Sequence, residues 1–321
     1  MNIFKADIEN IKLAASKIKA GELVAFPTET VYGLGADGLN ATAAAKIFEA
    51  KERPTFNPLI LHVNSQSQLN EIAEIPNELI HKLIEKFWPG PLTLVLPKKE
   101  IVPDIVTAGH KTVAVRMPNN EIALQLIEYS GVPIAAPSAN KFTQLSPTEA
   151  IHVKNQLGSR VSLILDGGKC SVGVESTIVA FLENKFVLLR PGGLSIESIE
   201  EVVGKMERKT IIDNPIAPGQ LPFHYAPKVK IKFLDSIKSD ELINKNIGGL
   251  FFHNSSSDIN FKIIKILSEK KDLIEAASNL FSSLHEFENE DLDLILVEKI
   301  PEEGLGIAIM DRLTKAVNKY S

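Results

Sequence analysis

The stretch GELVAFPTETVYGLGADGLNATAAAKIFEAKERPTFNPLILHV, residues 21–63, decides the fold, because polar and cationic groups stand at the ends of its apolar elements. Residues 22–26 form an apolar, partly β-branched run that predicts a short buried strand. The alanine-rich residues 41–50 predict a helix, since alanine has the strongest helix propensity, and residues 59–63 predict a second strand. This order is typical of an α/β protein with a ligand site at its strand ends.

The polar residues of this stretch have separate structural explanations. Lys51 and Arg53 follow the predicted helix and could simply complement the negative end of its dipole, which is worth about 0.3–1 kcal/mol. His62 could be a structural residue of the second strand, and Thr30 could satisfy loop backbone groups. The joint arrangement of hydroxyls, two cations, the Asn57 amide and an imidazole favours a ligand site instead.

Length and composition limit the class of protein. The chain has 321 residues, enough for two domains, with 44% hydrophobic and 23% charged residues, as in soluble globular proteins. No apolar run approaches the ~20 residues that cross a bilayer, and the first residues lack a signal-peptide core, so we expect a cytoplasmic protein without a membrane partner. The net charge of −5 argues against a globally basic, nucleic-acid-coating surface but leaves a local basic groove open.

Cys170 is the only cysteine. A single cysteine excludes an intramolecular disulfide and a thiolate zinc cage. It follows the turn-like DGGK without an evident neighbouring base, and we interpret it as incidental rather than as a nucleophile.

Two later strands are predicted to carry polar groups. Residues 112–116 alternate as a half-exposed strand, which places Thr112 and Arg116 on one face by the period of two. Residues 132–136 predict another strand, with the motif PSAN at its exit, residues 137–140. Ligands in open α/β sheets bind at such strand ends.

Two further candidates have both a structural and a functional interpretation. Ser146 heads the sequence SPTE, which predicts a helix N-cap, and a helix N-terminus is also a natural anion site. Arg190 ends the strand-like FVLLR. Its guanidinium fork suits carboxylate or phosphate recognition better than a lysine would.

The sequence resembles the threonylcarbamoyl-AMP synthases, a family built around a YrdC-like domain. The likeness rests on PTETVYGLG at residues 27–35, KERPTFNPL at 51–59 and PSAN at 137–140, and it extends over essentially the whole chain. It implies an α/β fold: a YrdC-like domain at 1–205 with an open twisted mixed sheet, helices and a large concave site. A linker at 206–228 that closes over the active site and a smaller Rossmann-like α/β domain at 229–321 would follow.

Within the predicted linker lies APGQLPFHYAP, residues 217–227, which is too rich in proline for a helix or a central strand. The simplest interpretation is a semi-rigid spacer. His224 and Tyr225 are unusual in a spacer, however, and the resemblance implies that the tyrosine is offered to the nucleotide. The family pattern has serine or threonine before the Pro-Gly pair and methionine after it, whereas this chain has Ala217 and Gln220.

The resemblance implies that L-threonine, bicarbonate and ATP give L-threonylcarbamoyl-AMP, pyrophosphate and water. A separate tRNA threonylcarbamoyl transferase complex would then use the product to modify the adenosine next to the anticodon. Lys51 and Arg53 suit the triphosphate and the departing pyrophosphate, because preorganised positive charge stabilises that transition state. Mg²⁺ is expected with ATP, and the sequence shows no carboxylate cluster that would indicate a dedicated protein site.

The resemblance also assigns the remaining site residues by position. The implied nucleotide-binding residues are Arg53, Asn57, Thr112, Ser138, Asn140, Ser146, Arg190 and Tyr225. The implied threonine-binding residues are Thr30, His62, Arg116, Ser176 and the backbone at Ala136. Arg116 is the natural partner of the threonine carboxylate, because a bidentate pair fixes orientation as well as charge.

Two other functions stay open at this point. A YrdC-like concave surface lined with basic residues could hold double-stranded RNA, although the acidic balance of the chain weakens that hypothesis. The second is a carbamoyl transferase of the hydrogenase-maturation type, which also has a YrdC-like domain. That family adds cysteine-based zinc modules, which a chain with one cysteine cannot contain.

Overall fold

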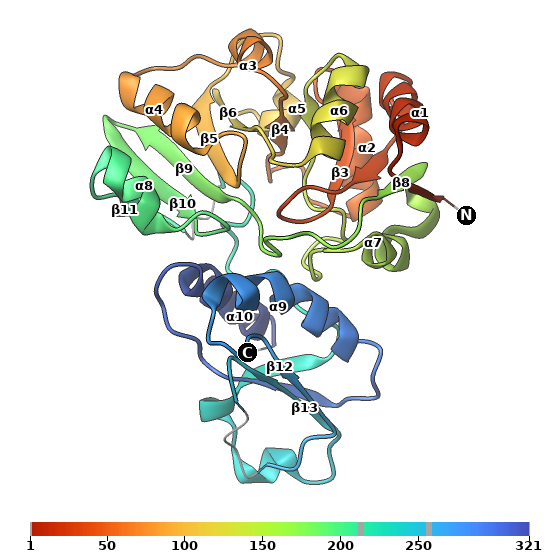
Figure 1. Ribbon diagram of the computed structural model, residues 1–321, viewed down its shortest axis with the longest axis vertical. Coiled ribbons are helices and arrows are strands. Elements are labelled where there is room, and N and C mark those ends of the chain that lie inside the picture. Colours follow the sequence, from red (N-terminus) through yellow and green to blue (C-terminus); the bar gives the residue numbers. More distant parts are fainter. Residues whose placement is uncertain (1, 211–214, 255–258, 321) are drawn as a thin grey trace.

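Two β-sheets organise the chain in the computed structural model, which describes residues 2–210, 215–254 and 259–320 (Figure 1). Within these residues the larger sheet has eleven strands, parallel and antiparallel, and the smaller sheet has four parallel strands. We call the larger sheet with its helices the N-terminal unit and the smaller one with its helices the C-terminal unit. The expected mixed α/β sheet followed by a smaller α/β part is confirmed.

The larger sheet has the following spatial order of strands: β1 (Ile3–Lys5), β8 (Leu163–Asp166), β2 (Val24–Phe26), β3 (Gly33–Asp37), β7 (Ile134–Ala135), β4 (Ile60–His62), β6 (Thr112–Arg116), β5 (Leu92–Pro97), β9 (Thr177–Leu182), β10 (Lys185–Arg190) and β11 (Glu207–Arg208). Its helices are α1 (Ile8–Lys19), α2 (Ala41–Lys51), α3 (Gln66–Ile72), α4 (Glu78–Phe87), α5 (Asp104–Thr107), α6 (Glu121–Ser130), α7 (Ala150–Leu157) and α8 (Ile196–Val203).

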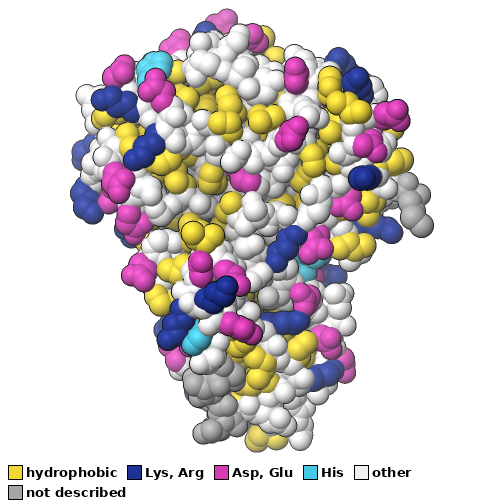
Figure 2. All heavy atoms as spheres, in the orientation of Figure 1, with side chains coloured by type: hydrophobic (Ala, Val, Ile, Leu, Met, Phe, Trp, Pro, Cys, Tyr) yellow, Lys and Arg dark blue, Asp and Glu magenta, His cyan; other side chains and the backbone are white. Residues whose placement is uncertain are grey.

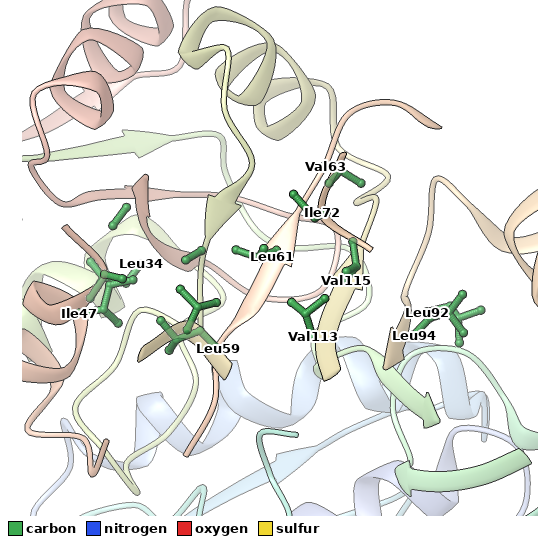
Figure 3. Packing of buried hydrophobic residues seen from close by; sticks show 14 of the residues in the cluster. Leu34, Ile47, Leu59, Leu61, Val63, Ile72, Leu92, Leu94, Val113 and Val115 are labelled. Atoms are coloured by element: carbon green, nitrogen blue, oxygen red, sulfur yellow. The ribbon is translucent and has the colours of Figure 1, made fainter. Parts of the chain in front are cut away.

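Alternation along the strands gives the two faces of this sheet different environments. Leu61, Val113 and Val115 point into the main core on one face, where α2 also packs (Figure 3). On the opposite face α1 and α6 cover β2, β7 and β8. Further along that face, Ile60 and Ala114 pack with residues of β9 and β10 and with Ala217 of the predicted linker. The candidate site lies on this part of the face.

The end of α2 explains how two cations come to lie beside the sheet. The helix begins after Asn40, whose side chain accepts hydrogen bonds from the first-turn amides. It ends at Lys51, and the cap residue Glu52 has the left-handed backbone angle φ 55°. The predicted end of this helix is confirmed. Because α2 packs its apolar stripe on the sheet, Lys51 and Arg53 are both buried.

The prediction that Ser146 caps a helix is wrong. Helix α7 starts four residues later, at Ala150, and the cap residue Glu149 makes no side-chain cap hydrogen bond. Two other contacts hold the segment extended: the Ser146 hydroxyl donates to Glu175, and the carbonyl of Pro147 accepts from the Tyr32 amide at 2.8 Å. A tertiary partner therefore outweighs the local capping signal.

The C-terminal unit has the strand order β12 (Lys230–Phe233), β15 (Leu294–Val297), β13 (Ile247–Phe251) and β14 (Ile263–Ile266). Its helices α9 (Leu273–Phe287) and α10 (Gly306–Asn318) lie on the side that faces the N-terminal unit (Figure 1). None of the helices in the described residues combines the length and apolar character needed to cross a bilayer.

The predicted linker, 206–228, includes strand β11, which pairs with β10 and extends the larger sheet. Residues 211–214 of this linker lie outside the described residues. The division of the chain at residues 205 and 229 stays a prediction.

Leu61→Ala should lower the free energy of unfolding by about 2–5 kcal/mol, because its side chain is fully buried in the main core and the change leaves a cavity. Urea denaturation followed by tryptophan fluorescence measures this loss, since Trp88 is the only tryptophan and is itself buried in the same unit. Leu13→Ala removes the same atoms from a side chain that is 42% exposed, and it should cost no more than about 0.5 kcal/mol. Equal losses for the two variants would contradict the placement of Leu61.

Candidate active site

A small pocket, with a cavity volume of about 40 Å³, lies on the part of the larger sheet's face that α1 and α6 leave uncovered. Its wall contains Thr28, Thr30, Val31, Gly33, Arg53, Ile60, His62, Arg116, Ala136, Pro137, Ser138, Glu175, Ser176, Arg190, Pro218, Gly219, His224 and Tyr225. Segments far apart in the sequence therefore converge on one cavity.

Register between β4 and β6 sets one corner of the pocket. His62 and Arg116 are directly paired across these parallel strands, so their side chains share a face. Arg116 Nη1 donates to the Thr30 hydroxyl at 2.8 Å, which ties the loop after β2 to the same corner. The predicted grouping of Thr30, His62 and Arg116 is thus seen in the geometry.

Arg116 forms a buried ion pair with Glu29 at this corner. Its Nη2 lies 2.6 Å from Glu29 Oε1, a distance typical of an ion pair. The approach is not aligned for a hydrogen bond, however, and within the described residues neither Nη2 nor the two carboxylate oxygens of Glu29 have a hydrogen-bond partner. A ligand carboxylate that bound Arg116 would therefore compete with Glu29 for Nη2.

His62 is a neutral imidazole at physiological pH. Burial, and then the positive charge of Arg116, lower the pKa of His62 to about 3. Its Nδ1 has no well-formed hydrogen bond to any described residue. The ring can therefore donate or accept one hydrogen bond to a ligand, but it does not supply positive charge.

Ser176 and Arg190 form the opposite wall. Arg190 donates through Nε and Nη2 to the carbonyl of Ser176 at 3.1 and 2.9 Å, and Nη2 also reaches the Ser176 hydroxyl at 3.1 Å. The same hydroxyl shares a hydrogen bond of 2.7 Å with Thr93 on β5. Gly192 permits this packing, because a Cβ there would meet the backbone of residues 175–176 at 2.3 Å.

Arg53 lines the pocket, and Asn57 holds it there. Arg53 Nη2 donates to the Asn57 side-chain oxygen at 2.7 Å and to the Pro58 carbonyl at 2.8 Å. Burial lowers the pKa of Arg53 to about 9, which leaves the guanidinium charged at pH 7. Asn57 itself lies behind Arg53 and outside the pocket wall.

Lys51 is buried behind the pocket rather than in its wall. Its ammonium group donates to the backbone carbonyls of Ser138 and Asn140, the first at 2.6 Å. The Ser138 hydroxyl in turn donates to the Asn140 side chain, so that Ser138 lines the pocket while Asn140 braces it from behind. Burial, and then the charge of Arg53, lower the pKa of Lys51 well below its ordinary value.

Two predicted nucleotide positions also lie outside the pocket wall. Thr112 starts β6 and is half-buried opposite Pro97. Ser146 is fully buried one step behind the wall, where its hydroxyl donates to Glu175. Ala136, in contrast, lies in the wall itself, as expected for a backbone contact.

Sequence reasoning missed Glu175 and Arg312. Arg312 Nε, on α10 of the C-terminal unit, donates to the pocket residue Glu175 at 2.7 Å. Burial alone would raise the pKa of Glu175, but the charges of Arg312 and then Arg190 lower it, so the carboxylate stays ionised. Glu175 directly precedes Ser176, which the family resemblance assigned to threonine binding, and this position could have pointed to it. Arg312 has no local signal, because 137 residues separate it from its partner.

The predicted linker supplies one side of the pocket through Pro218, Gly219, His224 and Tyr225. Tyr225 is buried and has φ 62°, a left-handed angle that tyrosine rarely adopts and that points to a functional constraint. Gly219 has φ 88°, and a Cβ there would meet Arg190 at 2.6 Å and the Tyr225 hydroxyl at 2.9 Å. Only glycine allows this close approach.

Gln220, which departs from the family pattern, closes the Pro-Gly turn. Its side-chain oxygen accepts from the backbone amides of Ile216 and Ala217, each at 3.0 Å, and its amide donates to the Lys209 carbonyl. Gln220 therefore shapes the turn from behind and does not line the pocket.

The described residues contain no group of three or more His, Cys, Asp and Glu side chains that could hold a metal ion. Cys170 is buried, and burial raises the pKa of its thiol. On the face shown in Figure 2, basic side chains lie among acidic ones in both units rather than in one continuous strip.

Comparisons with known proteins agree with this geometry. The family profile Sua5_yciO_yrdC, described as "Telomere recombination", matches residues 16–192, and the profile described as "Threonylcarbamoyl-AMP synthase, C-terminal domain" matches residues 194–317. The threonylcarbamoyl-AMP synthase of Pyrococcus abyssi (strain GE5 / Orsay) is 45% identical over 95% of this chain and 93% of that protein. The enzyme of the same name from Bacillus subtilis (strain 168) is 41% identical over 95% and 92%.

A solved structure extends the likeness to three dimensions. The crystal structure of P. abyssi Sua5 complexed with L-threonine matches with a TM-score of 0.90 at 43% identity, over 98% of this chain and 96% of that one. These findings support a synthase over the two alternatives, an RNA-binding module and a hydrogenase-maturation carbamoyl transferase. The chain belongs to the threonylcarbamoyl-AMP synthase family, in its two-domain form.

Proposed function

We propose that the protein condenses L-threonine, bicarbonate and ATP to L-threonylcarbamoyl-AMP, pyrophosphate and water. The observation that carries this is the convergence of three buried guanidinium groups, of Arg53, Arg116 and Arg190, on one pocket. One corner thus suits a carboxylate, and the remaining cations suit phosphates. The L-threonine complex of the similar P. abyssi protein supports the same choice of amino acid.

L-Threonine would bind at the corner formed by β4 and β6. The Arg116 guanidinium would pair with its carboxylate, and the neutral His62 would offer Nδ1 to a polar group of the ligand. Thr30, Ser176 and the backbone at Ala136 complete this half of the pocket. These groups are held by strand register and hydrogen bonds before any ligand arrives, so little reorganisation is needed on binding.

ATP would bind along the other half, with its phosphates near Arg53 and Arg190. In the reaction a carbamate oxygen of N-carboxylated threonine attacks the α-phosphorus, and the bond to the pyrophosphate oxygen breaks. Arg53 is buried and charged, which supports a role in neutralising the departing pyrophosphate. Ser138 and Tyr225 would contact the nucleotide directly.

The predicted residues behind the pocket wall would act through these groups. Asn57 fixes Arg53, Asn140 braces Ser138, and Ser146 holds Glu175. Lys51 would contribute by shaping the PSAN turn as well as by its position near the phosphate half. Thr112 lies at the edge of the same face and would contact the nucleotide from there.

Mg²⁺ would enter on the ATP phosphates rather than on a protein site. Glu175 is the only carboxylate among the described residues of the pocket wall, and Arg312 and Ser146 already occupy its oxygens. The protein side chains do not fit a dedicated magnesium site. We therefore derive no step through the ion.

Three expectations from the sequence go beyond the pocket and stay predictions. The product would pass to a separate tRNA threonylcarbamoyl transferase complex, the protein could contact RNA directly, and the reaction would take place in the cytoplasm. We also propose that the linker acts as a lid through its described residues 215–228, because Gly219 lies against Arg190 and Tyr225 at the pocket.

Purified protein with ATP, bicarbonate and L-threonine should form pyrophosphate and threonylcarbamoyl-AMP, both detectable by mass spectrometry. L-Serine, which lacks the methyl group, should react more slowly. Absence of both products from folded protein, or equal turnover with serine or with no amino acid, would overturn the proposed function.

Arg116→Gln should raise the KM for L-threonine about 10- to 100-fold and leave the KM for ATP nearly unchanged, since a charge-assisted hydrogen bond is worth about 1.5–3 kcal/mol. Arg53→Gln should do the reverse. Steady-state kinetics with each substrate varied in turn measures both. Arg160→Gln is a matched control, because that side chain is 39% exposed and pairs with Glu52 away from the pocket. Equal effects of the two pocket variants on both substrates would refute the division of roles.

Tyr225→Phe should weaken nucleotide binding about fivefold, because one hydrogen bond contributes about 1 kcal/mol. Titration calorimetry with a non-hydrolysable ATP analogue measures the change. Tyr129→Phe removes the same hydroxyl from α6, outside the pocket, and should have no effect. If Tyr225→Phe binds the ATP analogue with unchanged affinity, residues 206–228 are a spacer rather than a lid.

A further inference from the structure

Helix α10 of the C-terminal unit packs against the linker residues that line the pocket. Lys315 Nζ donates to the Gly219 carbonyl at 2.7 Å, and the Lys315 carbonyl accepts from the His224 amide at 3.3 Å. Asn318, three residues on, donates to the Pro222 carbonyl at 3.3 Å. Residues spaced by three share one helix face, so a single face of α10 supports the linker.

Arg312, one turn earlier on this face, touches both the linker and the N-terminal unit. Its guanidinium carbon lies 4.7 Å from the centre of the Tyr225 ring, within the range of a cation–π contact. Nε donates to Glu175 at 2.7 Å, and Nη1 donates to the Pro191 carbonyl at 3.0 Å. One buried side chain thus joins three segments that meet at the pocket.

Glu175, the partner of Arg312, also contacts Ser146. The Glu175 oxygen that does not face Arg312 accepts from the hydroxyl of Ser146, a predicted nucleotide residue. From the other side, His285 of α9 donates through Nε2 to the Ser146 carbonyl at 3.1 Å. The C-terminal unit therefore holds Ser146 through its backbone and, by way of Glu175, through its side chain.

Charge burial makes these contacts interdependent. Arg312 is 1% exposed, and a buried guanidinium is costly unless it is paired. Its partner on its own helix is Asp311, while Glu175 and Tyr225 become partners only when the unit is docked with the linker in place. Glu175 likewise loses its charge partner if α10 moves away. Undocking would therefore disturb the nucleotide half of the pocket.

We propose that Arg312 is a positioning residue through which the C-terminal unit completes the nucleotide site, by holding Tyr225 and the Glu175–Ser146 pair in place. The identity of the nucleotide as ATP rests on the proposed function. Because coupling between binding and docking is reciprocal, nucleotide binding should in turn tighten the docking of α10. Threonine, which would bind at the β4–β6 corner, should be coupled much more weakly.

The central test compares Arg312→Met, which keeps the long apolar stem, with Arg312→Lys, which keeps the charge but not the fork. Calorimetric titration with a non-hydrolysable ATP analogue should show at least tenfold weaker binding for Arg312→Met and a smaller loss for Arg312→Lys. The KM for L-threonine should change less than threefold. A merely structural role would lower stability and weaken both substrates alike, and that outcome overturns the proposal.

A double-mutant cycle tests whether Arg312 acts through Glu175. Glu175→Gln alone should weaken the ATP analogue, and adding it to Arg312→Met should cost little more than Arg312→Met alone. Fully additive losses would overturn this route. Lys265→Met is the matched control, because it removes an ion pair with Glu286 inside the same unit and away from the pocket.

Hydrogen exchange of the unmodified protein provides a readout that needs no variant to fold. The ATP analogue should slow exchange of the α10 amides, residues 306–318, and L-threonine alone should not. No change in α10 on saturation with the analogue would overturn the proposal. Protein that binds the analogue but forms no threonylcarbamoyl-AMP would overturn the proposed function alone, whereas protein that binds no nucleotide would overturn both.

Discussion

Burial of positive charge is the constraint on which the rest of the structure depends. Four guanidinium groups, of Arg53, Arg116, Arg190 and Arg312, are almost completely buried around one pocket. Each must be balanced, because an unpaired buried charge is strongly unfavourable. Glu29 lies against Arg116 and Glu175 against Arg312, while Arg53 and Arg190 rely largely on carbonyl and amide oxygens. The two arginines without a carboxylate partner are the ones that we propose to bind the ATP phosphates.

The surrounding elements can be understood as means of holding these cations. Strand register fixes Arg116 beside His62, and the end of α2 places Arg53 at the pocket. Gly219 lets the linker backbone approach Arg190 closely. Lys51 stabilises the PSAN turn through two carbonyl groups instead of entering the cavity. Such preorganisation suits a reaction that consists mainly of aligning three reactants and stabilising phosphate charge.

Periodicity and turn chemistry predicted the local structure well where local forces dominate. The strand–helix–strand segment at 21–63 is present with its helix ending at Lys51, and the period of two correctly placed Arg116 on the pocket face. The prediction that Ser146 caps a helix was wrong, because its buried hydrogen bond to the Glu175 carboxylate outweighs a helix cap worth only about 1 kcal/mol. The family resemblance identified candidate site residues. It did not distinguish residues in the pocket wall, such as Ser138, from residues that support the wall from behind, such as Asn57.

By itself the sequence determined the α/β class, the family and half of the residues of the pocket wall, because these depend on apolar periodicity and on short motifs. The tertiary structure alone decided how the pocket is completed. Glu175 and Arg312 lie 137 residues apart, and no local pattern predicts an ion pair that exists only after two units and a linker have packed together. Long-range charge pairing has no period in sequence, and for that reason the part played by α10 emerges only from the folded molecule.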